Sequence, residues 1–128
     1  MPLKNYLWYT MKILIVEDNS KMRDLIHKTI VQGLKDVDTV HACRNGQEAI
    51  DQYEIFKPDW VLMDIKMETV NGLTASQKIR EEHPDAKIII LTYYDDPLYR
   101  ESAKNFGVRA YVLKENLSDL PALIKNIL

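Results

Sequence analysis

The chain has little of several residue types that mark common protein classes. Among its 128 residues there is one cysteine, Cys43, which excludes an intramolecular disulfide and a cysteine-rich zinc site. The 17 basic and 19 acidic residues nearly balance to a formal net charge of −2, which argues against direct nucleic-acid binding by this domain. No apolar run approaches the roughly 20 residues that a membrane span needs. These absences favour a cytoplasmic protein that contacts no membrane.

The rest of the composition is ordinary for one globular domain, with 46% hydrophobic and 28% charged residues. A chain of this length is long enough to bury a core. Residues 1–10 precede Met11 and the strand-like run that begins at Ile13. We interpret them as an N-terminal extension that comes from an alternative start or was added by cloning. The domain is therefore expected over residues 11–128.

Short apolar runs alternate with helical periodicity along the whole chain. Strands are predicted at 13–16, 38–43, 60–63, 87–91 and 109–113, each followed by a helical pattern. The last helix is expected to begin at Ser118 as its N-cap, with Pro121 in its first turn. This order predicts an α/β fold, a flavodoxin-like doubly wound sheet of five parallel strands with five helices. The weak second strand fits an edge position and favours the strand order 2-1-3-4-5.

The apolar run from Trp60 to Met63 is followed directly by one carboxylate, Asp64. The carboxyl ends of parallel strands share one edge of the sheet, where ligands bind in open α/β folds. The other strands bring further polar groups to that edge: Glu17 and Asp18, Thr92, and Lys114. Each of them alone is more often a cap, a strand former or a solvated charge. Their coincidence at one edge argues for a functional site.

The chemistry of these side chains is mutually consistent. Crowded carboxylates need a cation, and oxygen ligands without histidine or cysteine suit Mg²⁺. With that charge neutralised, Asp64 becomes a candidate nucleophile toward a phosphoryl group. Thr92 offers a hydroxyl and Lys114 a positive charge for the phosphoryl oxygens.

The ordered set resembles the receiver domain of a two-component response regulator, over about residues 11–128. The resemblance is carried by Glu17-Asp18, the segment from Met63 to Met67 through Gly72, Leu91-Thr92, and Ala110 to Lys114. It implies that a sensor histidine kinase phosphorylates Asp64. It further implies that the chain is not an enzyme beyond promoting its own phosphorylation and dephosphorylation.

The resemblance also implies roles for the surrounding groups. Glu17, Asp18, Asp64 and the backbone carbonyl of Lys66 would bind Mg²⁺. Thr92 and Tyr111 would move together as a switch. The surface of the fourth helix, fifth strand and last helix would then change to control a partner or effector in a phosphorelay. Transcriptional control through a C-terminal helix-turn-helix domain, absent from this chain, is the expected output. The chain is either a stand-alone receiver or one domain of a longer regulator.

Three positions depart from the usual receiver pattern or vary within it. Tyr93 follows Thr92 where a small residue is usual, and Tyr94 and Lys66 occupy variable positions. We expect restricted access to the phosphoryl group and slow hydrolysis.

Other readings of the residues stay open at this point. A Mg²⁺-dependent phosphatase with an aspartyl nucleophile, of the haloacid-dehalogenase type, would need a second aspartate where Lys66 stands. A flavodoxin-like FMN binder is disfavoured because Glu17 and Asp18 would repel phosphate. A phosphorylation-independent interaction module would be expected to lack some of the acids. The apolar stripe of the last helix is explained by burial or by a homodimer; its members are Leu117, Leu120, Leu123, Ile124, Ile127 and Leu128.

Overall fold

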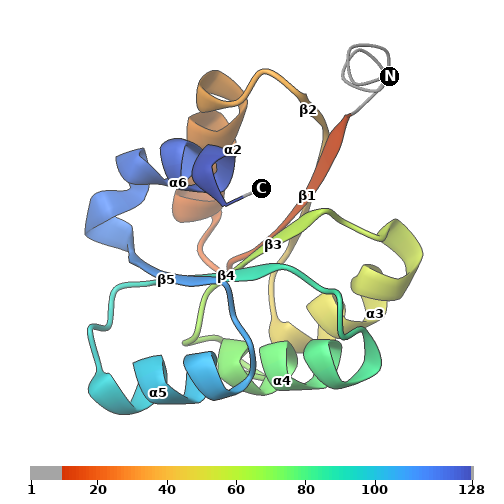
Figure 1. Cartoon of the computed structure of the whole chain (residues 1–128), viewed down its shortest axis with the longest axis vertical. Coiled ribbons are helices and arrows are strands. Elements are labelled where there is room, and N and C mark those ends of the chain that lie inside the picture. Colours follow the sequence, from red (N-terminus) through yellow and green to blue (C-terminus); the bar gives the residue numbers. More distant parts are fainter. Residues whose placement is uncertain (1–9, 128) are drawn as a thin grey trace.

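The computed structural model describes residues 10–127, so the expected N-terminal extension lies outside the described residues except for Thr10. Within that range five parallel strands form one sheet in the order β2-β1-β3-β4-β5, which confirms the predicted architecture (Figure 1). The strands are β1 (Met11–Val16), β2 (Val37–Cys43), β3 (Trp60–Met63), β4 (Ile88–Thr92) and β5 (Ala110–Leu113). The helices are α2 (Ser20–Gly33), α3 (Gly46–Phe56), α4 (Gly72–Glu82), α5 (Pro97–Asn105), a 3₁₀ helix η1 (Lys114–Asp119) and α6 (Leu120–Asn126).

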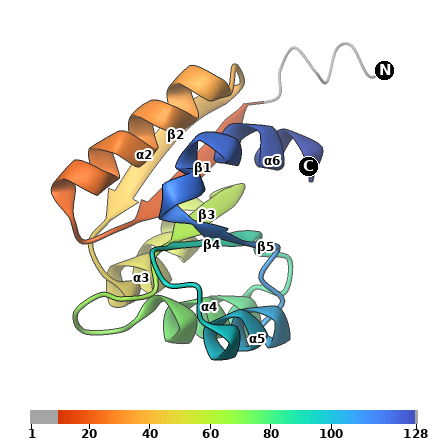
Figure 2. The same ribbon diagram turned by 90° about the vertical axis from the view of Figure 1, so that its left-hand side faces the viewer.

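The helices cover the sheet on both faces, with α2 and α6 on one and α3, α4 and α5 on the other (Figure 2). Strands β3 and β4 are buried along their whole length because both of their faces are covered. Strand β2 lies at the edge and is largely half-buried or exposed, as its weak apolar pattern predicts. Two apolar layers, one on each face of the sheet, therefore enclose the central strands and fix the positions of their carboxyl ends.

Four helices begin with a polar side chain that satisfies free backbone N–H groups. Asn19, Asn45, Asn71 and Asp96 are these N-caps, of α2, α3, α4 and α5 respectively, and each accepts a hydrogen bond from the first turn. Because the helices follow parallel strands, these four starts lie at the same end of the sheet as the carboxyl ends of β1 to β4. At the other end of α5, Gly107 has φ +80°, the left-handed conformation that commonly follows a helix.

The start of the last helix differs from the prediction. Ser118 is not an N-cap: it lies within η1, and α6 begins only at Leu120. After β5 the chain forms a 3₁₀ helix in which Lys114 and Leu117 are buried. This tighter helix occupies the residues where the N-cap and the start of the last α-helix were expected. Pro121 does lie in the first turn of α6.

Burial accounts for most of the apolar stripe on α6. Leu117, Leu120 and Ile124 are buried, and the half-buried Leu123 and Ile127 pack against the same core. Leu128, the last member of the stripe, lies outside the described residues.

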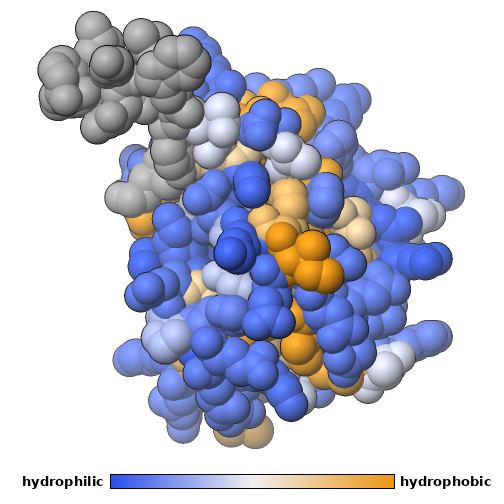
Figure 3. Space-filling model, turned by 90° about the vertical axis from the view of Figure 1, so that its right-hand side faces the viewer, coloured by the Kyte–Doolittle hydropathy of each residue, from blue (hydrophilic) through white to orange (hydrophobic). Residues whose placement is uncertain are grey.

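Figure 3 shows one face on which a band of hydrophobic side chains interrupts a mainly hydrophilic surface. The strongly exposed large apolar side chains include Ile55 on α3 and Leu98 on α5. None of the helices within residues 10–127 has the length and apolar character of a membrane span.

Candidate functional site

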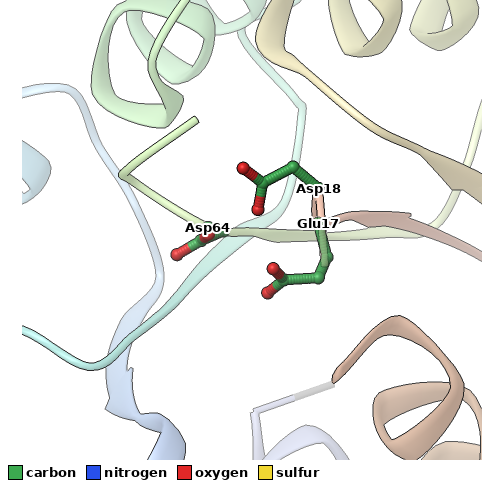
Figure 4. A group of neighbouring side chains, drawn as sticks. All are labelled: Glu17, Asp18 and Asp64. Carbon is green, nitrogen blue, oxygen red and sulfur yellow. The ribbon is translucent and has the colours of Figure 1, made fainter. Parts of the chain in front are cut away.

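Three carboxylates meet at the carboxyl ends of β1 and β3. Glu17 and Asp18 follow β1, Asp64 follows β3, and an oxygen of each lies within 4.8 Å of the others. Figure 4 shows the three side chains converging from the two neighbouring strands. Strand pairing enforces this arrangement, because Val16 pairs with Met63 directly before the acids.

Lys114 brings a positive charge into this cluster from the end of β5. Its Nζ lies 2.6 Å from Glu17 Oε1 and 3.3 Å from Asp64 Oδ1. The side chain is only 4% exposed, so these ion pairs are shielded from water and are stronger than surface pairs. Burial alone lowers the pKa of Lys114, but the hydrogen bond to Glu17 and the charge of Asp64 outweigh it, and the pKa is raised. The lysine therefore carries its charge at neutral pH.

The pKa of the Asp64 carboxyl group is shifted by its surroundings. Burial, followed by the charge of Glu17, raises the pKa of Asp64 from 3.8 to about 6, although Lys114 and the N–H of Ile65 oppose the shift. That N–H donates to Asp64 Oδ1 at 2.9 Å and orients the carboxylate. One lysine thus leaves the repulsion between the two buried acids partly uncompensated.

The donor set fits Mg²⁺. All three side chains supply hard carboxylate oxygens, the ligand type that this ion prefers. Asp18 is exposed whereas Glu17 and Asp64 are buried, so the cluster is open to solvent on one side. An ion that keeps several waters needs such an opening. A divalent cation would also relieve the repulsion from Glu17, which adds to the effect of burial in raising the pKa of Asp64.

Thr92 and Tyr111 are joined through a single residue between them. Thr92 is fully buried at the end of β4, and its Oγ1 accepts a hydrogen bond from the N–H of Tyr94 at 3.2 Å. The Tyr111 hydroxyl donates to the carbonyl oxygen of Tyr94 at 2.5 Å. The Arg100 guanidinium lies 4.5 Å from the centroid of the Tyr111 ring. Tyr94 is therefore bonded to both residues of the predicted switch.

Aromatic rings and long side chains line the opening of the pocket above the carboxylates. The ring of Tyr93 lies over Lys114, with Nζ 4.7 Å from its centroid, and is 62% exposed. The Lys66 ammonium lies 5.2 Å from the centroid of Tyr94 and 5.6 Å from that of Tyr99. The pocket has a volume of about 370 Å³, and its lining includes Lys66, Tyr93 and Tyr94 together with Met22 and Leu25 of α2.

The sequence did not reveal several residues that hold the site. The N–H of Asn19 donates to Glu17 Oε2 at 3.1 Å, and Arg23 Nη1 donates to the Glu17 carbonyl at 2.9 Å. Gly72 leaves no space for a Cβ, which would overlap the carbonyl oxygen of Asp64. Gly72 was already part of the resemblance, although the reason for a glycine there was not visible, and the asparagine directly after the acid pair, at a helix start, was a further signal that could have been found.

Comparison with known proteins gives the chain a family. Residues 13–126 match the model of the response regulator receiver domain. The chain is 32% identical over 116 residues to the transcriptional regulatory protein DegU of Brevibacillus brevis, which covers 91% of this chain and 48% of DegU. It is 35% identical over 107 residues to the response regulator VraR of Staphylococcus aureus, covering 82% and 50%. The chain thus spans about half the length of the curated relatives it matches.

Solved structures agree with this result. A DNA-binding response regulator of the LuxR family from Staphylococcus aureus has a TM-score of 0.84 at 31% identity, covering 91% of this chain and 98% of that one. The response regulator domain of Thermotoga maritima CheB, at 23% identity, shares the fold with a TM-score of 0.81 over 93% and 94% of the two chains. The chain therefore belongs to the response regulator receiver domain family.

Proposed function

We propose that this domain is a phosphoacceptor switch in which Asp64 takes a phosphoryl group from a sensor histidine kinase. The observation that carries the proposal is the position of Asp64, buried beside Lys114 Nζ at 3.3 Å and within 4.8 Å of oxygens of Glu17 and Asp18. A carboxylate in such surroundings is held in place for attack, with positive charge at hand for the incoming phosphoryl group.

The transfer exchanges one bond for another. A carboxylate oxygen of Asp64 attacks the phosphorus of the phosphohistidine, the P–N bond breaks, and the imidazole leaves with the electron pair and takes up a proton. Lys114 stabilises a phosphoryl oxygen, and the Thr92 hydroxyl turns toward another to donate a hydrogen bond. The domain supplies positioning and charge to this step, and in the same way promotes the later hydrolysis of its own acyl phosphate.

Glu17, Asp18, Asp64 and the backbone carbonyl of Lys66 would hold Mg²⁺. The ion, when bound, supplies positive charge beside the phosphoryl oxygens. The buried Glu17 and Asp64 fix two ligand positions, and the exposed Asp18 leaves room for water and for the phosphoryl group.

Tyr94 supports a mechanism for the switch. When the Thr92 hydroxyl turns to the phosphoryl group, it releases the N–H of Tyr94. The backbone of Tyr94 then shifts, and the Tyr111 hydroxyl loses its acceptor. A bistable pair of this kind turns a local charge into a change of the surface formed by α5, β5 and α6.

The residues at the pocket opening favour a long-lived phosphoryl group. The ring of Tyr93 covers the Lys114 ammonium, and Tyr94 holds Lys66 beside the pocket. Both arrangements obstruct the water that must attack the phosphorus in line. We therefore propose slower hydrolysis than in a receiver with small polar residues at these positions.

The names of the relatives support a transcriptional output. DegU is a transcriptional regulatory protein, and the LuxR-family neighbour is a DNA-binding response regulator. We propose that the signal passes from this domain to a C-terminal helix-turn-helix domain outside the present chain.

A homodimer through α6 would use the half-buried Leu123 and Ile127. Sedimentation that finds a monomer with and without phosphorylation would remove the dimer.

Intact-mass measurement tests the proposal. The protein is exposed to a small phosphodonor with Mg²⁺, as wild type and as Asp64→Asn. A phosphoryl adduct on the wild type alone is the expected result, because the amide cannot act as the nucleophile. Adducts on both proteins, or on neither, contradict the proposal.

A further inference from the structure

The loop that joins β3 to α4, residues 64–71, is held by two backbone hydrogen bonds to glycines. Near its start, the N–H of Gly72 donates to the Ile65 carbonyl at 2.9 Å. At its other end, the N–H of Gly46 donates to the Val70 carbonyl at 3.0 Å. Gly72 belongs to α4, which the loop enters, but Gly46 is the first residue of α3. A helix distant in sequence therefore fixes the end of the loop.

The contact between Gly46 and Val70 leaves no space for a side chain. A Cβ on Gly46 would overlap the carbonyl oxygen of Val70 and lie 2.9 Å from Val70 Cγ1. Gly46 is buried and does not have a positive φ, so glycine is required by the close approach of the loop and not by an unusual backbone conformation. Any larger residue there must push the loop away from α3.

The first turn of α3 is a firm support for the loop. The Asn45 side chain accepts from the N–H of Glu48 at 2.9 Å, and Glu48 Oε1 accepts from the N–H of Arg44 at 2.9 Å. These two hydrogen bonds fix the backbone on either side of Gly46. On the loop side, Thr69 has φ +65°, a conformation that is costly for a β-branched residue and needs support from its surroundings.

We propose that Gly46 is a positioning residue for the cation site, acting through the Val70 carbonyl on the loop that carries Asp64 and the Lys66 carbonyl. Gly46 contributes no ligand and lies on a different helix. Its effect is to seat the loop against α3, so that the loop's ligands face the carboxylates of Glu17 and Asp18. The inference rests on the proposed function for the identity of the ion, Mg²⁺.

Titration with Mg²⁺ alone, followed by amide NMR shifts, tests this role. Gly46→Ala is expected to raise the Kd for Mg²⁺ about tenfold, the scale of effect seen when a residue that orients metal ligands is lost.

The matched control is Gly33→Ala. There the new Cβ lies 2.5 Å from Pro121 Cβ, between α2 and α6 and away from the site. Gly33→Ala should lower Tm and leave the Kd unchanged. Wild-type Kd values in both variants would overturn the inference.

A second variant covers the case in which Gly46→Ala does not fold. Asn45→Ala removes the cap that steadies the first turn of α3 without adding a clash. A smaller rise in Kd supports the inference, and an unchanged Kd overturns it. The two proposals fail separately. If the Gly46 and Asn45 variants have a raised Kd for Mg²⁺ but the wild type takes up no phosphoryl group, only the proposed function is contradicted. If the wild type is phosphorylated but the variants bind Mg²⁺ with an unchanged Kd, only this inference is contradicted. No Mg²⁺ binding by the wild type contradicts both.

Discussion

The floor and the mouth of the pocket are built in different ways. The floor (Glu17, Asp64, Thr92 and Lys114) is at most 7% exposed, and buried ion pairs hold its charged members. The mouth (Lys66, Tyr93 and Tyr94) is exposed, and its contacts are cation–π interactions and backbone hydrogen bonds. Buried charge interactions are strong, whereas those in water are weak. We therefore expect the floor to determine whether phosphorylation occurs, and the mouth to set its lifetime and its readout.

The largest effect is expected from the charge of the floor. Lys114→Met should slow phosphorylation of Asp64 about a hundredfold, because it removes a group that stabilises the developing charge. It should also destabilise the fold at neutral pH by about 3–5 kcal/mol, since Glu17 and Asp64 are left facing each other. Urea unfolding and the rate of adduct formation measure the two effects. Lys66→Met, a lysine of the mouth, is the control. An equal loss of phosphorylation rate and stability in both variants would contradict the proposed difference between the floor and the mouth.

The pH dependence of stability is the next test of the floor. The pKa of Asp64 is raised from 3.8 to about 6 in the fold, so between these values the folded state binds more protons than the unfolded state. The stabilisation is fully present below about pH 4 and is lost as the pH rises through about 6. Its size is about 2–3 kcal/mol.

Urea unfolding of metal-free protein between pH 4 and pH 8 measures this loss. The Asp64→Asn variant should lack the contribution, so its advantage over the wild type should grow across that range. Parallel curves for the two proteins would show that the carboxyl group titrates normally and that its surroundings are not repulsive.

The mouth should act on lifetime and leave the chemistry intact. Replacing Tyr93 and Tyr94 together with alanine opens the pocket to water above Lys114. We expect the phosphoryl group on Asp64 to be lost about fivefold faster, which corresponds to about 1 kcal/mol in the barrier. Decay of the intact-mass adduct after removal of the donor gives the rate. An unchanged lifetime would remove the proposed role of these rings.

The smallest effect concerns the link between mouth and switch. Tyr111→Phe deletes the hydroxyl that donates to the Tyr94 carbonyl and should cost about 1 kcal/mol of stability. Tyr93→Phe removes a hydroxyl from a ring that is 62% exposed, and serves as the control with little expected change. Denaturant unfolding of both variants makes the comparison. Equal stabilities would argue that the hydrogen bond of Tyr111 contributes nothing to the unphosphorylated state.

The sequence predicted the sheet and the composition of the floor because both follow from strong local patterns. The uninterrupted apolar runs of β3 and β4 left little ambiguity: Asp64 directly follows β3, and β4 ends on Thr92. The prediction that the last helix begins at Ser118 was wrong. It relied on the preference of serine for N-cap positions, but the chain there forms a 3₁₀ turn in which Leu117 is buried. Propensity is a weak guide where tertiary packing opposes it.

The three residues of the mouth were predicted to restrict access to the phosphoryl group, but the hydrogen bonds that link the mouth to the switch, and the supports of the site, could not be predicted in the same way. The role of Tyr94 depends on its backbone N–H and carbonyl, which carry no signature in the sequence. The contact of Gly46 with Val70 joins two segments that lie on either side of β3 in the sequence. Both features depend on long-range geometry.

The most direct test of the account is to locate the phosphoryl group. The protein is phosphorylated with a small donor and Mg²⁺, the acyl phosphate is reduced with borohydride, and the peptides are analysed by mass spectrometry. We expect the reduced, alcohol-bearing residue at position 64, and we expect that it does not form when Mg²⁺ is chelated. Reduction at Glu17 or Asp18, or at position 64 regardless of Mg²⁺, would contradict the role of Asp64 as the phosphoacceptor.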